Sequence, residues 1–155
     1  NKTGKIHGFE IAAQHFFGGT GFGVSGAYTM VRGDVDFDNG APSSQDQFAL
    51  LGLSDTANAT LIYDKYGISA RIAYNWRDRF LQATNRGNGR NPVYVAPFGQ
   101  LDINISYDVT EKLAVSLEGI NLTKESLRTY GRDPNQLWFA QELDRRFLLG
   151  ARYRF

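Results

Sequence analysis

Seven stretches of this chain alternate between apolar and polar residues with a period of two, and this constrains the fold more than any other feature. In the clearest stretch, Leu101 to Val109, apolar and aromatic residues alternate with Asp, Asn, Ser and Asp. Such a period is typical of β-strands with one apolar face and one wet face. The sequence therefore predicts an all-β protein with strands at about residues 6–17, 21–37, 55–64, 66–82, 98–109, 113–123 and 143–155.

The connections between these stretches alternate strictly between short and long. The short ones are tight turns with the sequences GGTG (18–21), DKYG (64–67) and VTEK (109–112). The long ones are rich in Asn, Asp, Gly, Ser, Arg and Pro and lie at about 38–54, 83–97 and 124–142. Transmembrane β-barrels have this pattern, because their periplasmic turns are short and their extracellular loops are long. The sequence thus favours an antiparallel transmembrane barrel.

The lengths of the stretches also fit a membrane. A transmembrane strand needs about 9–11 residues, and most of the stretches reach that length. Residues 11–31 carry no charge, but five glycines, a Gln and a His within them argue against a membrane helix. Seven strands are an odd number, and an open sheet leaves two unpaired edges in hydrocarbon. We therefore expect the chain to be part of a larger barrel.

The composition and the motifs argue against an enzyme. The 155 residues include 17 basic and 16 acidic side chains and no cysteine, so nothing predicts a nucleic-acid partner. His7 and His15, with Glu10 between them, are too few for a metal site. The glycines of GFGVSG (21–26) precede an alternating stretch rather than the helix that a dinucleotide loop requires. We expect no catalytic residues, no metal and no cofactor.

Five segments carry a resemblance to a known family. They are YNWRDRFLQ (74–82), NPVYVAPFGQLDINISYDVTEKL (91–113), EGINLTKES (118–126), RTYGR (128–132) and RRFLLGARYRF (145–155). Together they resemble the C-terminal end of TonB-dependent outer-membrane receptors, most of all the proteobacterial branch often associated with carbohydrate uptake. The resemblance implies that residues 1–155 form the last seven strands of a 22-stranded barrel, without its plug domain and earlier strands.

The resemblance also implies a function, a location and partners. The protein would lie in the bacterial outer membrane and take part in the active import of a scarce nutrient, with an oligosaccharide as one expected ligand. Its partners would be the plug and remaining strands of the same receptor, the TonB complex, the barrel assembly machinery, outer-membrane lipid and the nutrient. The assembly machinery recognises a C-terminal strand that ends in an aromatic residue, which here implicates Tyr153 and Phe155.

Charged residues recur on the predicted lumenal face of neighbouring strands. Opposite charges on adjacent strands form cross-strand pairs. One interpretation is a wall of ion pairs that keeps the lumen wet and grips a plug, and another is a polar track that passes substrate inward; the first is favoured. The charged residues concerned are Arg71, Arg77, Asp102, Asp108, Glu118 and Arg152.

The long connections are the predicted place for ligand capture, because recognition concentrates on loops held by a rigid scaffold. Two of them combine Asn, Arg and aromatic residues, a mixture that suits a sugar. The candidate binding residues are Asn85, Arg86, Asn88, Arg90, Tyr130, Arg132 and Trp138.

Other functions stay open at this point. One alternative is a small barrel of about eight strands with a structural or adhesive role. Another is a receptor for a siderophore rather than a sugar. A soluble β-sandwich or lipocalin-like protein is disfavoured, because Trp76, Tyr107 and Tyr153 would lie on apolar faces with no second layer to cover them.

Overall fold

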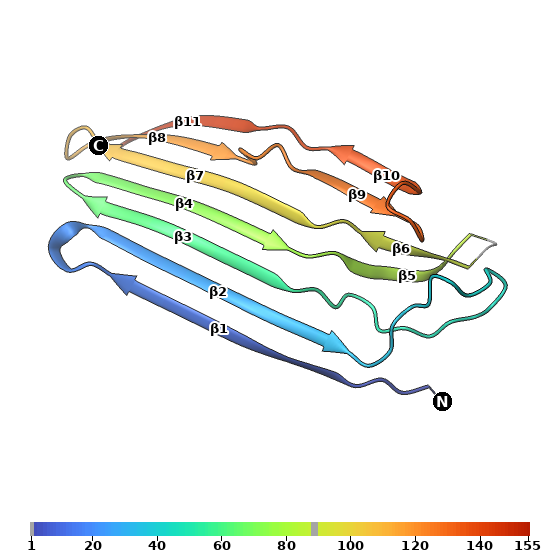
Figure 1. The fold of residues 1–155 in the computed structure, drawn as a ribbon. Helices are drawn as coiled ribbons and strands as arrows, with labels where there is room; N and C mark the ends of the chain where they lie inside the picture. Colours follow the sequence, from blue (N-terminus) through green and yellow to red (C-terminus); the bar gives the residue numbers. More distant parts are fainter. Residues whose placement is uncertain (1, 88–89) are drawn as a thin grey trace.

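The computed structural model describes residues 2–87 and 90–155, most of them in β-strands (Figure 1). All strand pairs are antiparallel. The elements are β1 (Ile6–Phe16), a 3₁₀ turn η1 (Gly18–Thr20), β2 (Phe22–Gly33), β3 (Thr56–Lys65), β4 (Ile68–Arg77), β5 (Phe80–Arg86), β6 (Asn91–Val95), β7 (Phe98–Asp108), β8 (Leu113–Ile120), β9 (Ser126–Tyr130), β10 (Leu137–Glu142) and β11 (Arg146–Tyr153).

The larger sheet contains the seven predicted strands, in the order β1-β2-β3-β4-β7-β8-β11. Each strand lies within one of the predicted stretches to within a residue or two, so the prediction of seven antiparallel strands is confirmed. The short turns gather at the end of the sheet that also holds the C-terminus, and the long connections leave from the other end (Figure 1). The sheet is open, with β1 and β11 at its edges.

A smaller sheet corrects the prediction for two of the long connections. Residues 83–97 and 124–142 were expected to be loops, but they contain most of two hairpins that form a sheet in the order β10-β9-β6-β5. These hairpins continue the β4–β7 and β8–β11 pairs beyond the long-connection end (Figure 1). The third long connection, residues 34–55, contains no strand, as predicted for 38–54.

The predicted strand 66–82 divides into β4 and β5 at Asp78, where the backbone bonds to another segment of the chain. At the division, the Asp78 backbone N–H donates to the carbonyl of Asp55 at 2.9 Å. The Ser54 hydroxyl donates to the carbonyl of Asp78 at 2.7 Å. Asp78 thus bonds to the end of the 34–55 loop instead of continuing the sheet, and this ties the loop to the boundary between the two sheets.

A similar break separates β8 from β9 at Asn121, whose φ of 56° ends the predicted strand 113–123 early. The Asn121 side chain donates to the carbonyls of Leu143 at 2.8 Å and Glu125 at 3.1 Å. Its Oδ1 accepts the Glu125 N–H at 2.9 Å, and its own N–H donates to Asp102 Oδ1 at 2.8 Å. Asn121 is 4% exposed and joins three segments.

The register of the larger sheet shows which residues share each of its two faces. On the predicted lumenal face, Arg71 lies opposite Asn104, and Asn104 lies opposite Glu118. The opposite face carries large apolar side chains that remain exposed in every strand, up to 86% for Leu149. They include Ile11, Val24, Leu61, Ile72, Ile105, Leu117 and Leu149. The predicted alternation is therefore present, but none of the residues that the structure describes covers the apolar face.

The buried apolar cluster lies elsewhere, between the 34–55 loop and the smaller sheet. It consists of Phe37, Ala49 and Leu81, with Tyr94 packed against it. Backbone hydrogen bonds from Gly52 N–H to Leu81 O at 2.8 Å and from Leu50 N–H to Val35 O at 3.2 Å hold the loop over it. Among the residues that the structure describes, no helix is long and apolar enough to cross a membrane.

Candidate functional site

A buried carboxylate anchors the base of the 34–55 loop. Asp55 is 7% exposed and receives two hydrogen bonds from the Arg32 guanidinium, the second at 2.8 Å. It also accepts the Tyr28 hydroxyl at 3.0 Å and the Val31 N–H at 3.2 Å. Against the effect of burial, these donors, Arg32 foremost, hold the pKa of Asp55 well below its usual range. The loop is thereby fixed to β2 where it joins β3.

The tips of the two outer hairpins hold the far end of the same loop. Arg132 follows β9, and its guanidinium donates to the carbonyls of Asn39 at 2.5 Å and Ala41 at 2.6 Å. Arg90, between β5 and β6, donates to the carbonyl of Ser44 and pairs with Asp46, with Nε and Oδ1 2.8 Å apart. We call the loop 34–55 and the two hairpins, residues 80–95 and 126–142, the outer rim.

Aromatic side chains connect the parts of the outer rim. Tyr94 and Tyr130 stack with centroids 5.6 Å apart, and the Tyr94 hydroxyl donates to Asn39 Oδ1 at 3.3 Å. The Trp138 indole N–H donates to the Pro92 carbonyl at 3.1 Å. The Arg86 guanidinium lies 4.8 Å from the centroid of the Trp138 ring. These contacts bind β10 and β9 to the β5–β6 hairpin.

The structure thus brings together most of the candidate ligand-binding residues in the outer rim. Their side chains already contact other residues of the protein. Arg86, Arg90, Arg132 and Trp138 all contact other rim segments, and Tyr130 is 7% exposed. Asn85 is exposed on β5. The candidate Asn88 lies outside the described residues. Ligand binding by these seven residues remains a prediction.

A cavity of about 430 Å³ lies under the rim. Its walls come from the end of β2, the 34–55 loop, the start of β5 and β6. Apolar side chains form one part of the wall and charged or amide groups form another. The lining residues are Val31, Arg32, Gly33, Asp36, Phe37, Asn39, Leu50, Leu53, Arg79, Phe80, Leu81 and Tyr94.

On the predicted lumenal face, the register sets none of the predicted arginines on β4 directly opposite an acidic residue. Arg71 lies opposite Asn104 and Arg77 opposite Phe98, so neither faces an acid. The Arg77 guanidinium lies 4.6 Å from the Phe80 ring centroid instead. Asp102 accepts the Asn121 N–H and two hydrogen bonds from Gln100. Within residues 2–87 and 90–155, the structure shows no ion pair among the six predicted charges.

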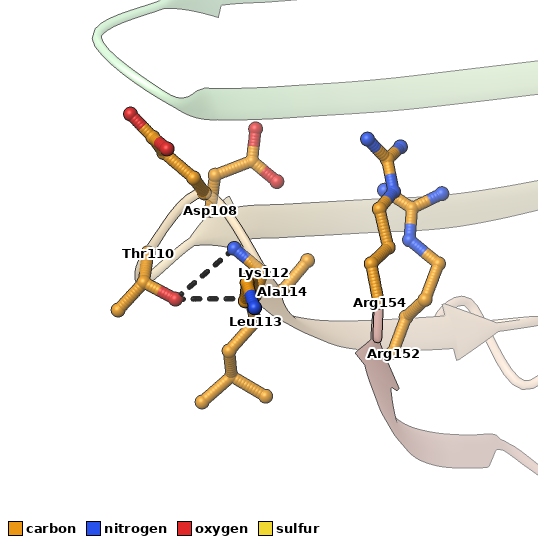
Figure 2. Close-up of a pocket in the computed structure, with 8 residues that line it drawn as sticks. Asp108, Thr110, Lys112, Leu113, Ala114, Arg152 and Arg154 are labelled. Carbon is orange, nitrogen blue, oxygen red and sulfur yellow. Dashed lines mark hydrogen bonds between the residues drawn. The ribbon is translucent and has the colours of Figure 1, made fainter.

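Two of these charged residues, Asp108 and Arg152, line the same cavity at the short-turn end. Asp108 pairs in register with Ala114, and Ala114 with Arg152, so the small alanine separates the two charges. They line a cavity of about 400 Å³ together with Glu111, Lys112 and Arg154. Figure 2 shows the guanidinium groups of Arg152 and Arg154 on the same side of the sheet as the Asp108 carboxylate. The Thr110 hydroxyl shapes the adjacent turn, accepting the Lys112 and Leu113 N–H groups at 3.2 and 3.0 Å (Figure 2).

Sequence reasoning missed Asp55, Arg32 and Asn121. Asp55 is the first residue of the predicted strand 55–64 and had no visible partner, since Arg32 lies 23 residues earlier. Asn121 appeared within a predicted strand, although its place before LTKE (122–125) is a turn signal of the kind that Asn favours. In the described part of the chain, no three His, Cys, Asp or Glu side chains are grouped so that they could hold a metal ion.

Comparison with known proteins gives a family match. The model of the family described as TonB dependent receptor-like, beta-barrel, matches residues 1–122. The match covers the larger sheet through β8 and ends before β9, β10 and β11. No curated protein and no solved structure matches the chain significantly.

Proposed function

This chain belongs to the TonB-dependent receptor-like β-barrel family, whose members act in transport across the bacterial outer membrane, and on that premise we propose that it is the C-terminal part of a receptor that actively imports a scarce nutrient. The family consists of transporters and not of enzymes. Loops would capture the nutrient, a plug inside the barrel would bind it, and the TonB complex would drive its release inward.

The observation that carries this proposal is the exposed apolar face of the larger sheet. A soluble protein of this size rarely leaves so large an apolar surface uncovered. The ten residues of β4 extend about 33 Å, or about 23 Å in height at a tilt of 45°. That height is close to the apolar band of about 25 Å in outer-membrane barrels. Lipid is therefore the partner that best covers this face.

The lumenal side supports a second part of the proposal. Asp108, Glu111, Arg152 and Arg154 line one cavity at the short-turn end and carry both signs of charge. Arg71 and Glu118 face the same side and are separated by Asn104. We propose that these charges contact a plug, because polar groups on a lumenal wall pair with another polar surface at low desolvation cost. Passage of substrate along them is the second candidate.

The C-terminal strand supports a role in assembly. Tyr153 and Phe155 lie with centroids 5.5 Å apart and planes at 80°, and both are exposed. β11 is an edge strand of the larger sheet, so its backbone can pair with a further strand, as the closure of a barrel requires. We propose that this aromatic pair is what the barrel assembly machinery recognises. Residues beyond 122 lie outside the family match, so this proposal rests on the resemblance and the geometry.

An oligosaccharide is the ligand class that we propose for the tips of the outer rim, with a siderophore as the alternative. Support comes from the exposed Asn85 and from Arg86, whose guanidinium lies over the Trp138 ring. Trp138→Ala tests the proposal in the full receptor. If the affinity for maltohexaose is unchanged in this variant, Trp138 is not an anchor for a sugar.

The transport proposal is tested with the full receptor in cells. The protein is expected in the outer-membrane fraction, and its migration on a gel should change on heating, because a closed barrel resists detergent until it is boiled. Uptake of radiolabelled maltohexaose should then require TonB. A protein that stays in the aqueous phase without detergent would contradict the membrane proposal, whereas uptake independent of TonB would contradict only the transport mechanism.

A further inference from the structure

The cavity under the outer rim holds opposite charges that do not neutralise each other. Arg79 and Asp36 both line it. Among the described residues, neither side chain forms an ion pair. Arg32 also lines the cavity, but its guanidinium is bound to Asp55. The charges available to a ligand are therefore one cation, Arg79, and one anion, Asp36, which come from different segments of the chain.

Both charges act on the same phenol. Burial raises the pKa of Tyr94 most, while Arg79 lowers it and Asp36 raises it. The Arg79 guanidinium lies 5.7 Å from the centroid of the Tyr94 ring. Tyr94 therefore marks the part of the cavity where the influence of the cation and of the anion overlaps.

The aromatic rings at this cavity have little free surface for a sugar. Tyr94 contacts Tyr130 and Arg79, Phe80 lies under Arg77, and Phe37 lies under Arg132. Sugar binding at aromatic sites depends on an open ring face, and in this cavity a cation or a second ring lies against each of the three rings. The free apolar wall is instead aliphatic, from Leu50, Leu53 and Leu81.

We propose that this cavity binds a small zwitterionic ligand with an apolar side chain, such as a hydrophobic amino acid or dipeptide. The ligand carboxylate accepts hydrogen bonds from Arg79, and its ammonium donates to Asp36. The apolar side chain contacts Leu50 and Leu53. The volume of about 430 Å³ falls in the range of small-molecule sites. The proposal rests on the proposed function, because it needs the rim to face the source of nutrients.

The test uses the full receptor in detergent and the dipeptide leucyl-leucine as the probe, with binding measured by isothermal titration calorimetry. Asp36→Asn and Arg79→Gln should each weaken binding about 10-fold or more, since each loses a charge-assisted hydrogen bond. Matched controls are Glu142→Gln and Arg128→Gln, which change exposed rim charges outside the cavity. N-acetyl-leucyl-leucine and leucyl-leucine amide should bind about 10-fold more weakly than the dipeptide.

The outcomes separate this inference from the proposed function. If the receptor is in the outer membrane and heat-modifiable, yet leucyl-leucine does not bind or binds equally well to the two cavity variants, the inference is wrong and the transport proposal stands. Displacement of the dipeptide by maltohexaose with loss in the same variants would assign the cavity to sugars and overturn the inference. A receptor that fails the membrane test contradicts the proposed function itself.

Discussion

Tyr94 and Tyr130 are register partners on β6 and β9, and their rings stack with an angle of 24° between the planes. Only one further pair, Val95 with Thr129, joins these two strands. The stack is therefore a principal connection between the two outer hairpins. Offset aromatic pairs of this kind add about 1 kcal/mol beyond the area that they bury.

Replacing Tyr130 should separate the hairpins. For Tyr130→Ala we expect a loss of about 3 kcal/mol in local stability, because a large buried ring is removed. Limited proteolysis of the full receptor would report it as faster cleavage within residues 126–142. Tyr130→Phe keeps the ring and serves as the control. Equal cleavage of the alanine variant and the wild type would show that the stack does not hold the hairpins together.

Arg132 should hold the 34–55 loop closed. Arg132→Gln removes two hydrogen bonds to the carbonyls of Asn39 and Ala41, for which we expect a cost of about 2 kcal/mol. Arg132→Lys keeps the charge but lacks the planar fork, so it should behave like the glutamine variant. Cleavage near Ala41 by a protease is the measurement, and Arg128→Gln is the control. Full protection in Arg132→Lys would show that charge alone is sufficient.

The Asp55 anchor should make stability depend on pH in the acid range. The pKa of this carboxyl is lowered on folding, while an unfolded Asp has a pKa of about 4. Its contribution is thus fully present above about pH 4 and is lost as the pH falls through the folded pKa. Asp55→Asn should destabilise the receptor by about 2 kcal/mol at pH 7, and the difference should shrink below pH 4.

Urea unfolding followed by tryptophan fluorescence at several pH values would measure this difference. Asp46→Asn is the control, because Asp46 forms an exposed ion pair with Arg90, and such pairs contribute about 1 kcal/mol at most. A difference between wild type and Asp55→Asn that is constant from pH 7 to pH 3 would contradict the anchor.

Asn121 should be required for the junction of β8, β9 and β11. Asn121→Ala leaves the Leu143 and Glu125 groups without their partner, at about 1–3 kcal/mol for each group, and alanine tolerates the positive φ of this position less well than asparagine does. Asn121→Gly loses the same side chain without the backbone strain and should be about 1 kcal/mol more stable than the alanine variant. Urea unfolding of both variants tests this order, and the reverse order would exclude backbone strain as a cause.

The sequence predicted those strands best that have one face toward lipid and one toward water, because only these strands alternate between apolar and polar residues. β7 was predicted almost to the residue, because Leu101 to Tyr107 alternate between a lipid side and a wet side. β9 and the part of β5 beyond residue 82 were not predicted, because strands such as FLQATNR and SLRTY carry no such alternation. The outer hairpins are held by side chains far apart in the sequence, and Arg132 bonds 93 residues back to Asn39. No local pattern encodes a contact of that range.

The same limit applies to the candidate site. Composition drew attention to the Asn- and Arg-rich connections, but it could not distinguish arginines that hold loops from arginines that bind a ligand. On the lumenal face, the sequence placed charges on adjoining strands but could not give their register, which sets Asn104 and not an acid directly opposite Arg71. Register depends on the turns at the strand ends, which the alternation of residues within a strand does not encode.

Because β5 continues β4, the sheet is long enough to extend beyond the membrane on the side of the outer rim. At about 3.3 Å per residue, the path from Ile68 to Arg86 is roughly 60 Å long, about twice the hydrocarbon thickness of a bilayer. The upper part would be the first surface that an antibody or a bacteriophage meets. Its epitopes would be assembled from three separated segments, residues 34–55, 80–95 and 126–142, so a short peptide from any one segment would be a poor immunogen for raising antibodies against the folded rim.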